Sequence, residues 1–401
     1  MDRLTNAVRP YPWGSTTALP ALMGLPPDGS PQAEMWMGAH PAAPSRVERA
    51  GRQLGLDRVI GADPAGELGD GLVRRFGPRL PFLLKLLAAD APLSLQVHPD
   101  AEQAAAGFAR ENAEGIPLDA PHRTYRDAQH KPEMIVALTP FTGLCGFRPP
   151  RESAELLDGL GVDRLAPYAA TLRSAPEETA LREVFSAFLS LGSDAPDLPA
   201  EIGGALAAAA RRPGPFREVY EVYEVIARAY PGDPGVPAAL LLRQVRLAPG
   251  EALFLGAGVP HAYLEGLGVE VMAASDNVLR CGLTSKHVDV PELLRVLRFS
   301  APPTPVTRPV RGEGPEEVYP APVDDFRLSR LVVDGPDGPE SVHALPGARP
   351  QILVCTEGTV RLAGAAGNEV VLTPGGSVYV PAGEEITVSG AGTVFRATTA
   401  V

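Results

Sequence analysis

A turn pattern that occurs twice constrains the fold of this chain more than any other feature. The first copy spans residues 250–261, has the spacing Gly-x5-Gly-x-Gly-x2-His, and ends at His261. The second copy spans residues 375–386 with the same spacing. In it, Pro replaces the middle Gly, and Ile386 stands at the position of His261. In both copies Gly stands where a strand–turn–strand backbone has to turn tightly. The pattern predicts two β-barrels of one kind, of which only the first keeps a metal-binding His.

The order of strand-like and helix-like segments predicts a β-domain that is interrupted by helices. Strand-like runs fill most of residues 1–150 and 236–300, whereas residues 151–235 carry apolar residues at steps of three and four. A Pro-rich segment at 301–322 is expected to be a linker, and residues 323–401 again read as strands and turns. We therefore expect a mainly β protein with an α insertion. It would comprise a discontinuous metal-binding barrel (1–150 and 236–300), a helical domain (151–235), the linker, and a C-terminal barrel (323–401) without metal ligands.

Individual elements follow from the same periodicities. Strands are predicted at residues 79–87, 93–98, 133–138 and 240–247. Helices are predicted at 101–110, 152–160, 177–191, 201–212, 218–230 and 291–297.

Four side chains from distant parts of the chain predict a metal site. Gln96 and His98 lie two positions apart on a predicted strand, so both project from the same face. Glu133 begins an apolar run, where an unpaired carboxylate would be costly. Together with His261 these residues offer two imidazoles, a carboxylate and an amide oxygen, which suits a divalent cation with a position left for substrate.

Composition limits the partners of this chain. The formal charge of -12 argues against a nucleic-acid or anionic-membrane surface. The three cysteines are widely spaced, and no run of about 18 apolar residues occurs. The first residues also lack the apolar stretch of a signal peptide. We expect a cytoplasmic monomer that acts on a small molecule.

Five separate motifs resemble those of one enzyme family, the type I mannose-6-phosphate isomerases of the cupin superfamily. They occur in the family's order and cover nearly the whole chain, although the helical insertion matches only in position and character. The motifs are YPWG at 11–14, AEMWMGAHP at 33–41, LSLQVHPD at 93–100, HKPEM at 130–134 and VEVMAASDNVLRCGLT at 269–284.

The resemblance implies roles for particular residues. It implies that one Zn²⁺ is bound by Gln96, His98, Glu133 and His261, and that Arg280 is catalytic. It also places Lys131, Glu270 and Asp276 in the site. The implied fold is two cupin-type (jelly-roll) barrels plus a helical domain, and the implied reaction interconverts mannose 6-phosphate and fructose 6-phosphate.

That reaction moves a proton between C2 and C1 through an enediol, so the site needs a Lewis acid and a base. Glu270 and Asp276 are both candidates for the base. For either residue, the alternative role of orienting a metal ligand or Arg280 is equally well supported. Lys85, Lys131 and Arg280 are the candidates for the phosphate contact. Trp13 is a candidate wall of the sugar site, with core packing as the alternative.

Two other functions remain open at the level of sequence. A cupin oxygenase that uses iron or manganese would employ the same four ligands, although an amide ligand is less typical of that class. A sugar-phosphate-binding bicupin without catalysis would keep the fold, but it would have no need of a base beside Arg280.

Overall fold

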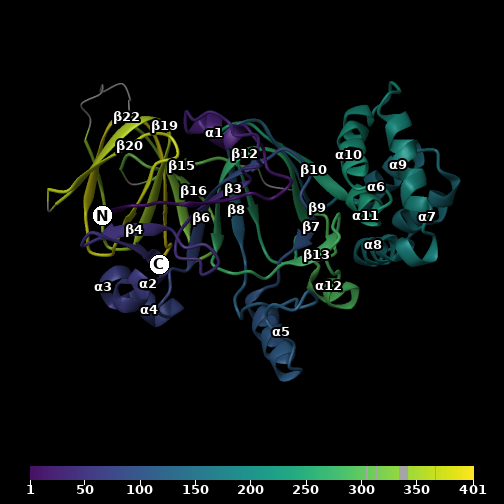
Figure 1. Cartoon of the computed structure of the whole chain (residues 1–401). Helices are drawn as coiled ribbons and strands as arrows, with labels where there is room; N and C mark the ends of the chain where they lie inside the picture. The colour runs from purple at the N-terminus through teal and green to yellow at the C-terminus, as the bar shows by residue number, and fades with distance from the viewer. Residues whose placement is uncertain (304–305, 313, 334–341, 366) are drawn as a thin grey trace.

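The computed structural model describes residues 1–401 except 304–305, 313, 334–341 and 366. Figure 1 shows two β-domains side by side, with a group of helices packed against the end of the first domain that is remote from the second. Both chain ends lie at the second, C-terminal β-domain. The predicted class, mainly β with an α insertion, is confirmed.

The first β-domain is an antiparallel sheet that folds over on itself around β12 (His261–Ala273). The first part of this strand pairs with β9, and the part after Gly266 pairs with β6 and β8. Gly266 has φ +127° and lies against Phe141 and Pro140, so a side chain would not fit at this change of partner. The other strands of this sheet are β2 (Ala7–Arg9), β3 (Glu34–Met37), β6 (Phe82–Ala89), β7 (Leu95–Val97), β8 (Glu133–Ala137), β9 (Phe141–Phe147), β10 (Leu242–Leu247), β11 (Ala252–Leu255), β13 (Leu279–Gly282) and β14 (Val306–Thr307).

The second β-domain is built around β19 (Gln351–Gly364) and β22 (Ile386–Thr398), which pair along their length. Its interior is a separate apolar cluster that includes Leu353 and Val394. The remaining strands of this sheet are β1 (Asp2–Arg3), β15 (Val310–Arg311), β16 (Glu317–Tyr319), β17 (Arg327–Val333), β18 (His343–Leu345), β20 (Glu369–Leu372) and β21 (Ser377–Val380).

The repeated turn has the same local structure in both domains, as predicted. Gly258 (φ +77°) and Gly383 (φ +88°) both adopt the left-handed backbone that favours glycine. Three residues later, His261 and Ile386 each begin a long strand, β12 and β22. Ile386 is buried in the apolar cluster of the second domain, so the position of a ligand in one barrel is a core position in the other.

The helical insertion shares one apolar core with the end of the first β-domain, where Phe147 and Phe299 stack against each other. The four helices predicted between residues 152 and 230 are present, within a few residues at each end. Two further helices, α7 and α11, were not predicted. The helices are α6 (Pro150–Gly159), α7 (Ala166–Ser174), α8 (Glu177–Asp194), α9 (Leu198–Ala209), α10 (Arg217–Ala229) and α11 (Gly235–Leu240).

The N-terminal segment contains helices where only strands and turns were expected. These are α1 (Ala18–Leu22), α2 (Leu56–Ala62), α3 (Pro64–Leu68) and α4 (Asp70–Phe76), which follow a small hairpin, β4 (Arg46–Arg49) and β5 (Arg52–Gly55). The segment packs onto the second β-domain: Tyr379 donates a hydrogen bond of 3.0 Å to the carbonyl of Glu67, and Arg49 bridges Glu67 and Asp2.

Pairing between strands also crosses the proposed domain boundaries. β1 extends the second sheet, and residues 301–322 contain β14, which joins the first sheet, and β15 and β16, which join the second. The division into domains stays a proposal. In the described part of the chain no helix is long and apolar enough to cross a bilayer.

Candidate active site

Three of the four predicted metal ligands come together inside the first β-domain. His98 follows β7, Glu133 opens β8 and His261 opens β12. His261 Nε2 lies 3.0 Å from Glu133 Oε1, and His98 Nε2 lies 3.4 Å from Glu133 Oε2. All three residues are buried, and their ligand atoms lie within 4.8 Å of one another. Adjacent strands of one folded sheet thus bring together residues that are separated by up to 163 positions in the chain (98 to 261).

The polar atoms of this cluster are oriented for a cation. His98 Nδ1 lies 2.9 Å from the carbonyl of Asn277, and His261 Nδ1 lies 2.9 Å from the carbonyl of Val259. Donation to these carbonyls leaves both Nε2 atoms as acceptors. Within the described residues, His98 Nε2, His261 Nε2 and Glu133 Oε1 are buried without a hydrogen bond of good geometry. Buried acceptors that face one another repel unless a cation lies between them, so the arrangement fits a metal.

The protonation states of the cluster also suit metal binding. Burial and the charge of Lys131 lower the pKa of His98 to about 4, so its imidazole is neutral at neutral pH. Burial opposes ionisation of Glu133, but His98, His261 and Lys131 hold the pKa of its carboxyl well below the usual range. A neutral imidazole and an ionised carboxylate are the forms that bind metals. Lys131 Nζ lies 3.9 Å from Glu133 Oε2, which places this predicted residue beside the cluster.

Gln96 lies next to the cluster in the sheet. It pairs across β7 with His261 on one side and with Arg280, in β13, on the other. Gln96 and Arg280 also line the cavity above the cluster. Coordination of a metal by the Gln96 amide stays a prediction.

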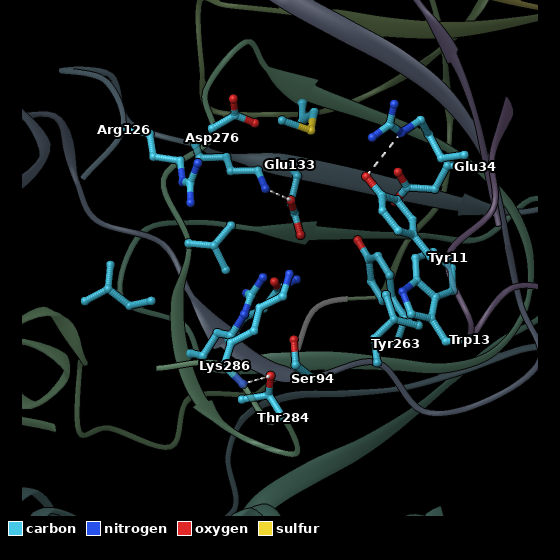
Figure 2. Close-up of a pocket in the computed structure, with 18 of the residues that line it drawn as sticks. Tyr11, Trp13, Glu34, Ser94, Arg126, Glu133, Tyr263, Asp276, Thr284 and Lys286 are labelled. Atoms are coloured by element: carbon cyan, nitrogen blue, oxygen red, sulfur yellow. Dashed lines mark hydrogen bonds and ion pairs between the residues drawn. The ribbon is translucent and has the colours of Figure 1, made fainter. Parts of the chain in front are cut away.

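A cavity of about 1120 Å³ opens above these residues. In Figure 2, Glu133 lies at its centre, Tyr11, Trp13 and Tyr263 form one wall, and Arg126 and Lys286 lie on the opposite side. Tyr11 and Trp13 stack with their ring centroids 5.6 Å apart, and Trp13 packs against a small apolar cluster that includes Phe141. Trp13 therefore both packs and faces the cavity.

Arg126 and Lys286 lie on the side of the cavity opposite the aromatic wall, and Arg280, which also lines the cavity, is close enough to interact electrostatically with both. Burial and Arg126 lower the pKa of Arg280. Arg280, burial and Arg126 lower the pKa of Lys286. No carboxylate of the described chain lies within ion-pair distance of any of the three. A group of like charges that repel one another is suited to an anion.

Arg126 and Lys286 were missed by reasoning from the sequence. Both lie in loops, one after the helix α5 (Ala101–Ala113) and one after β13, and neither belongs to a predicted element. Ser94 and Thr284, whose hydroxyls line the same side of the cavity, were also missed, although Ser94 lies in the predicted strand 93–98 and Thr284 ends the motif at 269–284. For Lys286, the one available signal was its position two residues after the motif at 269–284.

Lys85 is held between two carboxylates. Its Nζ lies 2.9 Å from Glu270 Oε2 and 3.6 Å from Glu34 Oε1, and it directly faces Glu270 across β6 and β12. Glu34 also accepts a hydrogen bond of 2.6 Å from the indole of Trp36. Although burial opposes its charge, Glu270 and Glu34 raise the pKa of Lys85. Because this charge is already balanced, Lys85 is less suited to a phosphate than the three cations opposite, and its substrate contact stays a prediction.

The two candidate bases have different surroundings. Glu270 is buried, and burial raises the pKa of its carboxyl although Lys85 opposes the shift. Asp276 has a side chain that is 47% exposed and lies 3.4 Å from His40 Nε2. Burial raises the pKa of Asp276, but His40 and Lys131 outweigh it and the net shift is downward. Both carboxylates line the cavity.

Comparison with known proteins agrees with this geometry. Residues 1–150 match the family model described as phosphomannose isomerase type I, catalytic domain. The chain is 42% identical over 402 residues to mannose-6-phosphate isomerase of Escherichia coli, with 99% of both chains covered. The chain belongs to the mannose-6-phosphate isomerase family. The human member is 34% identical, over 96% of this chain and 94% of its own length.

Solved structures of mannose-6-phosphate isomerases share the whole fold. The holo, zinc-bound form of one such enzyme superposes with a TM-score of 0.90 at 38% identity, covering 100% of this chain and 99% of that one. Another, bound with zinc and yttrium, has a TM-score of 0.89 at 38% identity over the full length of both chains. The prediction of two cupin-type barrels with a helical domain is confirmed by this match.

Proposed function

We propose that this chain is a zinc-dependent aldose–ketose isomerase that interconverts mannose 6-phosphate and fructose 6-phosphate. One observation carries the proposal. Among the described residues, His98, His261 and Glu133 present buried ligand atoms without hydrogen bonds, and Glu133 lines a cavity that is also lined by three cations without ion pairs, Arg126, Arg280 and Lys286. This arrangement offers a metal site and an anion site in one cavity, as a phosphorylated sugar requires.

His98, Glu133 and His261 would hold the zinc, with the amide oxygen of Gln96 as the proposed fourth ligand. With one carboxylate among four ligands, the site would keep a net positive charge. Bound zinc supplies a Lewis acid that polarises sugar oxygens beside the carbon that loses its proton. The carbonyls of Asn277 and Val259 keep both imidazoles in the orientation that such binding needs.

The phosphate would be bound by Arg280, Lys286 and Arg126. Arginine offers a planar fork of donors that matches phosphate oxygens, and the hydroxyls of Ser94 and Thr284 provide further donors nearby. An incoming dianion relieves the repulsion among the three cations, which favours phosphorylated over neutral sugars. The aromatic wall at Trp13 would bound the sugar on the other side.

Proton transfer requires one positioned base. We assign this role to Glu270, because a raised pKa brings a carboxylate nearer to the operating pH. The base would take the C2 proton of the aldose and return it to C1, while the O2 hydroxyl proton moves to O1. Lys85, at 2.9 Å from Glu270, would stabilise the charged carboxylate before it takes the proton and after it returns it. Asp276, with its lowered pKa, would orient a sugar hydroxyl.

The two alternative functions are not favoured. The relatives that match the whole chain are named isomerases from bacteria and mammals, and no oxygenase is needed to explain the site. The enzyme acts on a sugar phosphate. A monomeric state and a cytoplasmic location stay predictions, and the former can be tested by measuring molar mass in solution.

The test is coupled turnover of mannose 6-phosphate by the purified protein, beside His261→Ala. We expect turnover in the unmodified protein. In His261→Ala, we expect bound metal to be lost and turnover to fall by more than the roughly 10–100-fold that follows removal of a residue that only supports a metal ligand. His343→Ala, in the second β-domain, is the matched control and should be unchanged. A folded, zinc-loaded protein without turnover would contradict the proposal.

A further inference from the structure

Asn277 is fully buried and its side chain holds one loop of the cavity wall. Its Oδ1 accepts hydrogen bonds from the backbone N–H groups of Arg126 (2.8 Å) and Asp127 (3.3 Å). Its Nδ2 donates to the carbonyls of Asp127 and Gln129, both at 2.8 Å. One amide side chain therefore satisfies four backbone groups in residues 126–129, a segment without helix or strand.

The main chain of the same residue holds a metal ligand. The carbonyl of Asn277 lies 2.9 Å from His98 Nδ1, the interaction that directs His98 Nε2 into the ligand cluster. The side chain and the carbonyl of one residue thus contact the loop that carries Arg126 and the imidazole that faces the metal position. No other residue of the described chain joins these two groups directly.

Asp127 strengthens this connection from the loop side. Its Oδ1 accepts from the Ser275 hydroxyl (2.9 Å), and its Oδ2 accepts from the backbone N–H of Asp276 (2.8 Å). Both donors directly precede Asn277 in the chain. Directional hydrogen bonds, rather than apolar packing, therefore hold the loop on residues 275–277.

We propose that Asn277 is a positioning residue that sets the distance between the metal position and Arg126, and through it the selectivity for a phosphorylated sugar. The inference rests on the proposed function, because it takes Arg126 as a phosphate contact. Arg126 is exposed at the cavity mouth and forms no ion pair with the described residues, so its backbone anchor determines where its guanidinium can reach. A fixed distance between metal and cation matches one length of substrate.

The test uses Asn277→Asp, which keeps the size of the side chain but places a carboxylate oxygen against the carbonyls of Asp127 and Gln129. We expect KM for mannose 6-phosphate to rise about tenfold or more, with kcat changed less than about threefold. The reason is that the hydrogen bonds donated by Asn277 Nδ2 are lost and the new carboxylate oxygen repels the carbonyl oxygens of Asp127 and Gln129. Inhibition by inorganic phosphate should weaken by the same factor. Zinc content should be unchanged, because His98 is held by a backbone carbonyl.

Arg126→Met and the double variant separate positioning from a general structural effect. If Asn277 acts through Arg126, the double variant should have the KM of Arg126→Met alone. Asn368→Asp, at an exposed site of the second β-domain, is the matched control and should match the unmodified protein. If Asn277→Asp does not fold, Asp127→Asn is used, since it removes only part of the docking and should raise KM in the same direction.

If the increases in KM caused by Asn277→Asp and Arg126→Met multiply in the double variant, the inference is wrong, but the proposed function still stands. An unchanged KM in Asn277→Asp, or in Asp127→Asn where that variant is used, would do the same. An unchanged KM in Arg126→Met would remove Arg126 from the phosphate site and the inference with it. Absence of turnover in the unmodified protein would instead contradict the proposed function itself.

Discussion

The carboxylate of Glu270 shows how one residue's chemistry depends on its neighbours. It is buried, which raises its pKa, and it faces Lys85, which lowers it. Glu34 shares the same ammonium at 3.6 Å. The balance of these effects determines whether the carboxylate accepts a proton at the working pH.

Removal of the Lys85 charge tests this balance. A base must be deprotonated to act, so kcat/KM falls as pH falls through the pKa of Glu270, which lies above its ordinary value of 4.5. Lys85→Met removes the group that favours the charged form, so the acid limb of the kcat/KM profile should move to higher pH. The measurement is the pH profile of both proteins.

Lys286→Met is the matched control for this prediction. It removes a cation from the phosphate side of the cavity, so KM should rise while the acid limb keeps its position. An acid limb that stays in place or moves to lower pH in Lys85→Met would show that Glu270 is not the base.

At single residues, the sequence predicts the metal cluster better than the anion site. His98, Glu133 and His261 belong to strands or their ends, where period-two alternation and fixed turns determine direction. Arg126 and Lys286 lie in loops, and their approach to Arg280 depends on tertiary contacts such as those of Asn277. No local pattern encodes such contacts.

At the scale of elements, the segment between β7 and β8, which contains α5, is packed through a close contact between Gly107 and Tyr125. Helix α5 begins with a capping box in which Asp100 and Gln103 bond each other's backbone N–H groups. On this helix, a Cβ at Gly107 would lie 2.3 Å from the ring of Tyr125. Tyr125 is buried and donates a 2.6 Å hydrogen bond to Glu292 in α12 (Val290–Val296). Gly107 thus permits the contact that closes the loop.

Gly107→Ala should therefore destabilise the protein, although alanine favours a helix. Overpacking of this kind costs about 1–3 kcal/mol. Gly204→Ala is the control, because Gly204 lies inside α9 with no atom within 4 Å of an added Cβ, and there alanine should stabilise by up to about 1 kcal/mol. The midpoints of urea unfolding measure both, and equal shifts in one direction would contradict the prediction.

Element prediction succeeded where the periodicity was long and failed where it was short. α8 and α10 bury one face over several turns, and both were predicted. α2, α3 and α4 have 7, 5 and 7 residues, too few for a helical period to appear, and they pack on the second β-domain through contacts from distant sequence.

At the scale of the whole molecule, the two barrels have divided their roles. The interior of the second contains a buried polar network in which Arg396 bonds Glu316 (2.8 Å) and Gln351 (2.6 Å). The Ser329 hydroxyl donates a further hydrogen bond to the Glu316 carboxylate. The charges are satisfied within the protein, and among the described residues only the first barrel gathers a possible metal cluster.

Arg396→Met should destabilise the second barrel without changing kcat. It leaves the buried Glu316 carboxylate unpaired, which costs about 3–5 kcal/mol. Arg361→Met is the control, because its ion pair with Glu369 is exposed and is worth at most about 1 kcal/mol. Thermal unfolding and turnover below the transition measure the two effects, and a reduced kcat in folded Arg396→Met would contradict the division of roles.

The measurement that tests the central claim most directly is mannose 6-phosphate turnover during removal and stepwise restoration of zinc. Turnover should disappear with chelation, return in proportion to added zinc, and reach its maximum at one zinc per chain, because the first barrel alone holds the cluster of His98, Glu133 and His261. Full turnover in thoroughly metal-free protein, or a maximum only at two zinc ions per chain, would contradict this account.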